Sequence, residues 1–323
     1  FEMIDDLGPS WFASKITEEG RSVPKILESV SEGKFYEEKK GDVLFFGTDG
    51  NYHKINRPEG YLTAADVKRG KEPIFRNPSA SLWDIGDQIT VFEIHSKSNT
   101  FDSTLLEFLN QCIDLVSSSY KGMIIYNEGD FFSAGANLGE ALFLGNIGLD
   151  TEVEKNILIK GQEVFSKLKY SKFPVIAAPF NLALGGGCEI ILHSDYVQAH
   201  IELYIGLTEA ALGILPAWGG CKELLSRFSS NDSFPKGPMA AVMKTFELIG
   251  KAKVSTSAKE AKNIGYLKDS DGITMNRNRL LFDAKMKAIE MSKNYKIPEK
   301  KIYFLPGKTA VAAIMLTLEN MQS

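Results

Sequence analysis

An alternation of short apolar segments with longer amphipathic segments between residues 88 and 200 limits the fold more than any other feature. Four of the apolar segments have the composition and length of buried strands: "QITVFEIHS", "GMIIYN", "FPVIAAPF" and "DYVQAH". Residues 101–120, after the first of them, place Leu105 and Cys112 on one helical face, and residues 152–170, before the third, are also amphipathic. Strands that alternate with helices of this length form right-handed crossovers, so we predict an α/β fold.

The two ends of the chain have other patterns. Apolar residues at helical spacings predict two short helices within residues 1–40, which are too small to bury their own apolar faces. Glycine, proline and charge with little periodicity predict a linker with one hairpin over residues 41–80. We expect the main domain over residues 81–323, with C-terminal helices from about residue 276, where "NRNRLLFDAKMKAIEMSKNY" is typical of a long final helix.

Composition excludes several classes of protein. The 323 residues are 44% hydrophobic and 24% charged, as in an ordinary globular protein, and the net charge of -4 comes from interspersed charges, so we expect no nucleic-acid partner. Three cysteines without CxxC spacing and four histidines without HxH or HExxH spacing argue against a disulfide framework and a metal site. The cysteine pattern fits a reducing, cytoplasmic setting, and no apolar stretch is as long as a membrane span.

Three consecutive glycines, Gly185 to Gly187, stand directly before "CEIILHS", which has the composition of a buried helix. Glycine lets another molecule approach the backbone closely, and a helix N-terminus adds positive potential there, so this turn suits an oxygen that becomes negative. Tight helix–strand packing is the commoner explanation for an isolated glycine run. A dinucleotide-binding loop is a further alternative, although the G-x-G-x-x-G spacing is absent.

Two more segments support the first explanation. "FFSAGANLGEALF", residues 131–143, also runs from a buried strand through small residues into a short helix, and two such turns can offer one N–H each to the same oxygen. "YIGLTEAALGILPAWGG" carries Glu209, twenty positions after Glu189. Both acids stand among apolar neighbours, where burial raises a carboxyl pKa into the range useful for proton transfer.

Each acid also has a structural explanation. Glu189 would interact favourably with the dipole of the helix that it begins, and an isolated Glu209 would more often be a surface acid. Because both acids and both turns occur together, we prefer the catalytic interpretation. Cys188 and His193 are expected to be structural, since nothing basic stands beside the cysteine to lower its pKa.

The three segments, in this order and at these spacings, resemble the crotonase superfamily of enoyl-CoA hydratases and isomerases, from about residue 81 to the C-terminus. "SAGANL", "ALGGGCE" and "LTEAALGILPAWGG" carry the resemblance. It implies a ββα spiral core with a helical C-terminal region, oxyanion-hole N–H donors at Ala136 and Gly186, and catalytic glutamates at Glu189 and Glu209. It further implies that substrate binding involves Ser133, Ala134, Gly135, Leu138, Gly185, Pro216 and Trp218.

The activity that this resemblance implies is hydration of trans-2-enoyl-CoA in fatty acid β-oxidation, with an acyl-CoA as substrate, no metal and no separate cofactor. Double-bond isomerisation and a non-catalytic CoA-binding scaffold remain open as alternatives. The chain departs from the family in several places. Asn137 stands where many members have Asp, Gly139 where some have a lysine near the CoA phosphates, and Trp218 replaces a small residue, which would narrow the acyl pocket.

The first residues, "FEMIDDLG…EEGRSVPKILE", are similar to the end of the C-terminal domain of 3-hydroxyacyl-CoA dehydrogenases. Such domains precede a crotonase domain in multifunctional fatty-acid-oxidation proteins, and "AKVSTSAKEAKNIGYLKDSDGITMNRNRLLFDAK" resembles the continuation in that class. The resemblance implies that residues 1–40 are a helical remnant of that domain and the chain a fragment of such a protein, with NAD used only by the dehydrogenase part. A homo-oligomer and contact with the dehydrogenase domain both stay open.

Overall fold

The computed structural model describes residues 1–39 and 41–322, without the side chains of residues 320–322, and the chain divides into two compact units. The smaller unit contains residues 1–61 and 69–71, and the larger unit contains residues 62–68 and the described residues from Glu72 onward. No helix in the described part of the chain is long and apolar enough to cross a bilayer.

The smaller unit combines three helices with a small antiparallel sheet: α1 (Glu2–Leu7), α2 (Pro9–Glu18), α3 (Lys25–Val30), β1 (Tyr36–Lys39), β2 (Asp42–Phe46) and β3 (Tyr52–Lys54). Leu27, Val30 and Phe35 form its core. The carboxylate of Asp5 accepts the N–H of Phe35 at 2.6 Å and ties a helix to the residue just before the sheet. The single hairpin expected after residue 40 is therefore part of a three-stranded sheet.

The larger unit is built on a seven-stranded sheet with the order β12-β10-β8-β7-β6-β5-β4. Neighbours from β12 to β6 are parallel, and β5 and β4 add an antiparallel edge. The strands are β4 (Phe75–Arg76), β5 (Ala80–Asp84), β6 (Ile89–Ile94), β7 (Gly122–Ile125), β8 (Val175–Ala177), β10 (Tyr196–His200) and β12 (Gly272–Thr274). The predicted α/β class is confirmed.

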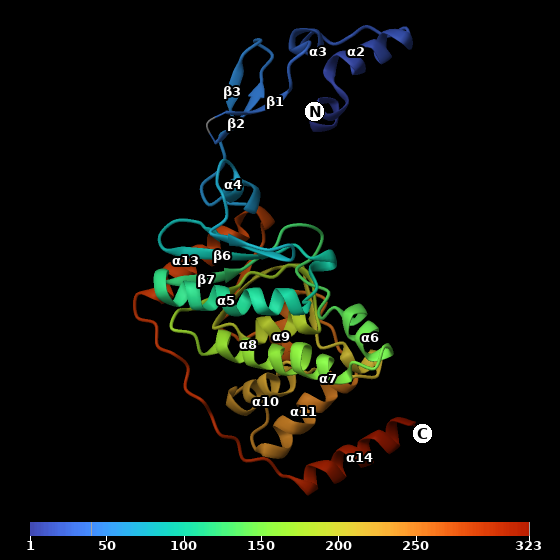
Figure 1. The fold of residues 1–323 in the computed structure, drawn as a ribbon, viewed down its shortest axis with the longest axis vertical. Coiled ribbons are helices and arrows are strands. Elements are labelled where there is room, and N and C mark those ends of the chain that lie inside the picture. The colour runs from blue at the N-terminus through green and yellow to red at the C-terminus, as the bar shows by residue number, and fades with distance from the viewer. Residues whose placement is uncertain (40, 323) are drawn as a thin grey trace. The chain divides into compact units, whose positions relative to one another are not determined.

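Helices connect these strands and cover the sheet, with α5, α8 and α9 below it in Figure 1. The helices are α4 (Ala64–Lys68), α5 (Ser103–Ser119), α6 (Leu138–Asn146), α7 (Asp150–Glu152), α8 (Lys160–Lys169), α9 (Gly186–His193), α10 (Gly220–Ser230), α11 (Pro238–Gly250), α12 (Ala258–Ile264), α13 (Leu280–Ser292) and α14 (Lys308–Gln322). Short helical turns are η1 (Lys97–Asn99), η2 (Val153–Ile159), η3 (Glu209–Leu212) and η4 (Arg277–Arg279).

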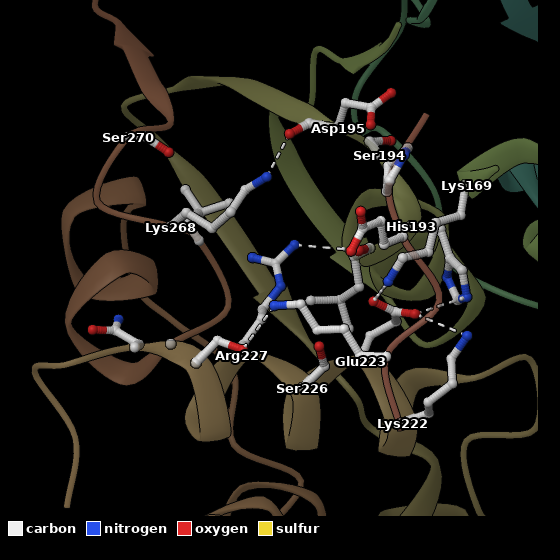
Figure 2. A pocket seen from close by; sticks show the side chains of 18 of the residues that line it. Lys169, His193, Ser194, Asp195, Lys222, Glu223, Ser226, Arg227, Lys268 and Ser270 are labelled. Carbon is white, nitrogen blue, oxygen red and sulfur yellow. Dashed lines mark hydrogen bonds and ion pairs between the residues drawn. The ribbon is translucent and has the colours of Figure 1, made fainter. Parts of the chain in front are cut away.

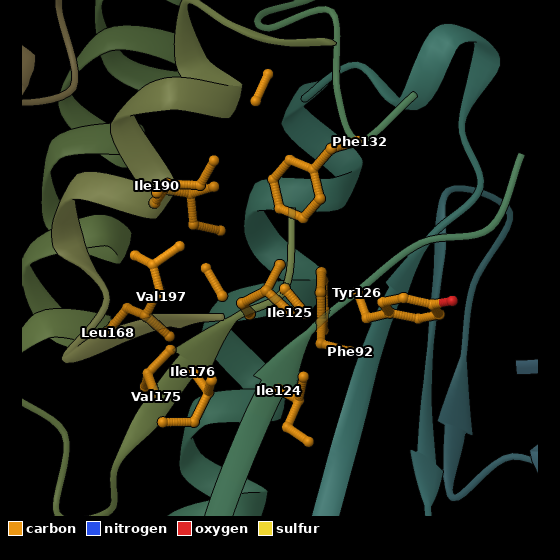
Figure 3. Packing of buried hydrophobic residues seen from close by; sticks show 14 of the residues in the cluster. Phe92, Ile124, Ile125, Tyr126, Phe132, Leu168, Val175, Ile176, Ile190 and Val197 are labelled. Carbon is orange, nitrogen blue, oxygen red and sulfur yellow. The ribbon is translucent and has the colours of Figure 1, made fainter. Parts of the chain in front are cut away.

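One hydrophobic core holds the larger unit together. The predicted face of α5 is buried in it, with Leu105 and Cys112 both 0% exposed, and Asp102 caps the helix by accepting the N–H of Leu105. Figure 3 shows apolar side chains from four strands and two helices in one cluster. Those labelled from β6, β7, β8, β10, α8 and α9 are Phe92, Ile124, Ile125, Val175, Ile176, Val197, Leu168 and Ile190.

A second sheet carries the glycine run. β9 (Asn181–Leu184) pairs in parallel with β11 (Leu203–Gly206) and leads directly into Gly185. The strand within "FPVIAAPF", β8, does not itself lead into the glycines, because it ends at Ala177 and the chain changes sheets before it reaches them. The turn into α9 is therefore supported from both sides, by β11 and by the bridge between residues 133 and 183.

Two helical predictions also need correction. The helix expected over residues 152–170 contains a π-helical segment, η2, before α8. The long final helix expected over residues 276–295 is a 3-10 turn followed by α13, which ends at Ser292, and α14 follows it as a separate helix.

Candidate active site

The two turns predicted from the sequence lie against each other. Ser133 and Ala183 form a parallel bridge, and the N–H of Leu184 donates to the carbonyl oxygen of Ser133 at 3.0 Å. An ideally placed Cβ on Gly186 would lie 3.3 Å from the backbone nitrogen of Ala136. The structure thus brings together the two residues expected to donate N–H groups.

The N–H groups of Ala136 and Gly186 donate no hydrogen bond to any other described residue. Ala136 bridges to Phe101 only through its neighbours: Phe101 N–H donates to the oxygen of Gly135 at 2.9 Å, and Asn137 N–H donates to the oxygen of Phe101 at 2.8 Å. In such a parallel bridge the N–H of the middle residue points away from the partner. Gly186 begins α9, where an N–H has no partner within the helix.

Each glycine of the run meets its own requirement. Gly185 has φ 51° and ψ -121°, a conformation that residues with a side chain rarely adopt. A Cβ on Gly186 would lie 2.5 Å from the ring of Trp218. A Cβ on Gly187 would lie 2.7 Å from the Cβ of Ser133. Close packing therefore accounts for two of the three glycines, while the N–H of Gly186 stays available to a ligand. The two explanations of the glycine run apply together.

Glu189 is buried in the first half of α9, with 2% of its surface exposed. Its Oε1 accepts the N–H of Trp218 at 2.9 Å and that of Gly220 at 2.7 Å. Burial is the main cause that raises the pKa of Glu189 to about 8, and the charge of Glu209 adds to it against the lowering effect of the two N–H groups. Most Glu189 side chains therefore carry a proton near pH 7.

Glu209 begins η3 and completes an acid pair beside the glycines. It is 9% exposed, and burial raises its pKa. Its Oε1 would lie 3.3 Å from a Cβ on Gly185, and its Oε2 is buried without a hydrogen-bond partner among the described residues. A buried carboxyl oxygen without a partner is unfavourable for folding and is typical of functional sites.

Trp218 lies beside both parts of this site. Its backbone N–H holds Glu189, and its ring, 3% exposed, covers Gly186. Among the other residues predicted to bind substrate, Gly135 has φ +99°, and a Cβ on it would lie 3.3 Å from the nitrogen of Gly186. Pro216 is buried two residues before Trp218.

The remaining predicted residues lie at the start of α6. Leu138 is 36% exposed as the first residue of this helix, and Ala134 is exposed. Asn137 caps α6, because its Oδ1 accepts the N–H of Glu140 at 3.3 Å. Gly139, the second residue of α6, is also exposed. The departure at Asn137 therefore has a structural role.

Sequence analysis missed a loop that supports the first turn. The N–H of Ala134 donates to the oxygen of Ser98 at 3.2 Å, and the hydroxyl of Ser133 donates to the oxygen of Asn99 at 2.7 Å. The side-chain amide of Asn99 donates to the oxygen of Phe131 at 2.9 Å. No sequence signal marks these residues, since they lie more than thirty positions before the turn that they hold.

A cavity of about 850 Å³ lies elsewhere in the larger unit, between the end of α9, α10 and residues 298–303, and neither Glu189 nor Glu209 lines it. Figure 2 shows Glu223 between Lys169 and Lys222, close to His193. Lys222 Nζ lies 2.9 Å from Glu223 Oε1, and Lys169 also pairs with this carboxylate. Because neither predicted acid reaches this cavity, and Lys169, Lys222 and Glu223 pair with one another there, the cavity is not the candidate active site.

The described residues hold no group of three or more histidine, cysteine or acidic side chains placed to bind a metal ion. Cys188 is fully buried, and the Nδ1 of His193 bonds to the carbonyl oxygen of Glu189 at 2.7 Å. The chemistry available at the site is therefore proton transfer by two carboxyl groups and hydrogen bonding by two backbone N–H groups.

The turns and acids just described lie within a segment that matches a known family model, "Enoyl-CoA hydratase/isomerase", over residues 85–230. Residues 85–230 belong to this family. The solved structure of an enoyl-CoA hydratase from Bacillus anthracis is similar, with a TM-score of 0.53 and 25% identity over 67% of this chain and 75% of that one. Pseudomonas aeruginosa DspI shares the fold at 21% identity, with a TM-score of 0.57 over 74% of this chain and 85% of that one. The fold is that of the crotonases.

Two curated relatives extend the similarity beyond the family domain. A protein of Bacillus subtilis named "Probable 3-hydroxyacyl-CoA dehydrogenase" is 37% identical over 100% of this chain and 41% of its own length. A "Putative fatty acid oxidation complex trifunctional enzyme" of Rickettsia felis is 30% identical over 83% of this chain and 34% of its own length. The chain thus spans less than half the length of these relatives, and the first alignment includes residues 1–40.

Proposed function

We propose that the larger unit hydrates trans-2-enoyl-CoA to 3-hydroxyacyl-CoA. The observation that carries the proposal is the convergence of two buried acids and two unpaired N–H groups on one glycine turn: Glu209 lies against Gly185, and Ala136 against Gly186. The family match and the names of the relatives support an acyl-CoA substrate of fatty acid oxidation.

The acid pair would move the protons. Burial raises both pKa values, and the charge of Glu209 raises that of Glu189 further, so we assign the one resting proton of the pair to Glu189 and the negative charge to Glu209. The charged carboxylate takes a proton from water as the water oxygen forms its bond to C3, and the neutral carboxyl gives its proton to C2. The electron pair of the C2–C3 double bond moves toward the thioester oxygen and returns to form the new C2–H bond. Water is added in full, and the pair ends with one proton, as it began.

The N–H groups of Ala136 and Gly186 would hold the thioester oxygen while it carries that negative charge. Removing one donor of an oxyanion hole typically costs about 3 to 4 kcal/mol of transition-state stabilisation. The loop at Asn99 and the packing of Ser133 against Gly187 support both turns, and we expect them to hold the two N–H groups in position for one acceptor.

Two observations weigh against the alternatives. Isomerisation needs one acid to move a proton between carbons, whereas this chain buries two, and the second provides the base that a water nucleophile requires. A scaffold would have no use for Glu209 Oε2, which is buried without a partner at the expense of folding free energy. A dehydrogenase that consumes 3-hydroxyacyl-CoA would act on the product proposed here, which fits the name of the Bacillus subtilis relative.

The test follows the loss of the enoyl-thioester absorbance when the purified chain is mixed with crotonyl-CoA. We expect hydration in the wild type and its loss in Glu209→Gln. A parallel assay with a 3-enoyl-CoA measures isomerisation. Isomerisation without hydration would replace the proposal by its alternative, and binding of butanoyl-CoA without either reaction would favour the scaffold.

A further inference from the structure

The ring of Trp218 occupies a closed niche that adjoins the proposed site. A Cβ on Gly161, in α8, would lie 2.1 Å from the indole Nε1, and a Cβ on Gly186 would lie 2.5 Å from the opposite side of the ring. The indole therefore fits only because both positions lack a side chain. It spans the space from the glycine turn to α8.

Three further contacts keep the ring in this place. Nε1–H donates to the carbonyl oxygen of Ile157 at 2.9 Å, within the π-helical segment. The rings of Phe165 and Phe101 pack edge-on against the indole, with centroid distances of 5.3 and 5.9 Å. Any rotation of the ring would break the hydrogen bond and drive atoms into Gly161 or Gly186, so the side chain is fixed.

We propose that Trp218 is a specificity-determining residue that closes the acyl-binding space and restricts the enzyme to short-chain enoyl-CoA substrates. This inference rests on the proposed function. With the thioester oxygen on the N–H groups of Ala136 and Gly186, C1 lies beside the residue that the indole covers. C3 must lie within reach of the acid pair, and Glu189 is held by the backbone N–H of Trp218 itself.

A carbon chain that continues past C4 toward α8 therefore meets the flat indole, backed by Phe101 and Phe165. The ring blocks this route without taking part in the chemistry. The Glu189 contact comes from the backbone N–H, so a change of the Trp218 side chain leaves that contact in place. Chain-length preference and catalysis can consequently be separated by mutation.

The experiment measures kcat/KM for crotonyl-CoA and trans-2-decenoyl-CoA with wild type, Trp218→Leu and Trp218→Phe. We expect wild type to prefer crotonyl-CoA by at least about tenfold, the scale of discrimination by an apolar pocket. Trp218→Leu should raise the decenoyl-to-crotonyl ratio at least about tenfold, and Trp218→Phe should raise it less. Trp83→Leu is the matched control, since Trp83 also donates its Nε1–H, to Ser81 at 2.8 Å, but lies on β5 away from the acid pair. It should leave the ratio unchanged.

A wild type that hydrates both substrates equally, or a Trp218→Leu variant with an unchanged ratio, overturns the inference and leaves the proposed hydratase function standing. If wild type hydrates neither substrate, the proposed function fails, and calorimetry with butanoyl-CoA and decanoyl-CoA tests Trp218 without chemistry. Trp218→Leu should then tighten the binding of decanoyl-CoA alone, and tightening of neither ligand overturns the inference. Melting curves verify folding, and Trp218→Phe, which keeps a packed ring, provides the comparison if the leucine variant does not fold.

Discussion

Two sets of buried carboxylates in the larger unit, the acid pair Glu189 and Glu209 and the lysine-paired Glu223, have pKa values that move in opposite directions. Glu189 accepts two backbone N–H groups, Glu209 lies against Gly185, and burial raises both pKa values. Burial also acts to raise the pKa of Glu223, but the ammonium groups of Lys169 and Lys222 oppose it, and the net pKa lies below its usual range. Burial lowers the pKa of His193 to about 4, so the imidazole is neutral near pH 7 and the two ammonium groups balance the charge of Glu223.

Burial alone therefore does not mark a catalytic acid. A buried carboxylate with two cations is stable as a charged group and contributes to the fold. A buried carboxyl without a cation holds its proton up to neutral pH and can exchange it there, at the expense of stability. His193 contacts residues of both sets. Its Nδ1 bonds to the carbonyl oxygen of Glu189, and its Nε2 lies 3.6 Å from Oε1 of Glu223.

The largest expected effect is a loss of activity when either member of the acid pair is replaced. Glu189→Gln and Glu209→Gln should each lower kcat for crotonyl-CoA hydration by about 100- to 10,000-fold, the usual contribution of general acid–base catalysis. The glutamine at position 189 can still accept the N–H groups of Trp218 and Gly220, so the fold should remain. Initial rates and circular dichroism measure both. Glu107→Gln, on the exposed face of α5, is the control, and near-native turnover in either site variant would remove that acid from the mechanism.

The next largest effect is a loss of stability when the lysine-paired Glu223 is replaced. Glu223→Gln should lower the free energy of unfolding by about 3 to 5 kcal/mol, because it leaves Lys169 beside a neutral group in a largely buried pocket. Urea unfolding at pH 7 measures the loss. A loss much smaller than 1 kcal/mol would show that the cluster is no more than a surface ion pair.

The pH dependence of the unfolding free energy should further distinguish Glu189 from Glu223. The pKa of Glu189 is raised from 4.5 to about 8 on folding, so its contribution is fully favourable below pH 4.5 and is lost as the pH rises toward 8. Relative to wild type, Glu189→Gln should therefore gain about 2 to 4 kcal/mol between pH 5 and pH 8, at about 1.4 kcal/mol for each pKa unit. Urea unfolding of both proteins at the two pH values tests this. An equal difference at both pH values would mean that Glu189 is charged throughout.

The smallest effect is expected for Lys222, the more exposed of the two lysines that pair with Glu223. Lys222→Gln should cost about 1 kcal/mol or less, because half of the lysine side chain is exposed and Lys169 still pairs with Glu223. The same urea titration measures it. A loss as large as that of Glu223→Gln would assign the main charge balance to Lys222 and not to Lys169.

The sequence predicted the parts of the molecule that depend on local pattern. Apolar periodicity located β6, α5 and β7, and the three motifs placed Ala136, Gly186, Glu189 and Glu209 in segments that the structure brings together. Periodicity works here because each strand and helix faces one continuous core.

Other parts could not be predicted, because they depend on contacts between distant segments. Nothing in the sequence pairs Gly161 with Trp218, or Glu223 with Lys169, since these partners stand more than fifty positions apart. Composition marks "LYIG" as a strand, which is β11, but the pairing of β11 with β9 was not predicted, because β9 is short and lies close to a longer apolar run. The burial of Glu223 could not be predicted either, because the sequence around it is typical of an amphipathic helix with its acids in solvent.

The number of residues in the π-helical segment η2 matters for the position of Trp218 as much as their identity does. A π turn holds one residue more than an α turn, and the surplus residue sets the rotation between the carbonyl of Ile157 and Gly161 on α8. Deleting Leu158 would turn Ile157 by about 100° relative to α8, the rotation of one helical residue. The carbonyl would then leave Trp218 while every side chain around the ring kept its identity. A deletion of a single residue, outside both turns, would thus break the hydrogen bond of the indole without changing any residue that contacts the ring.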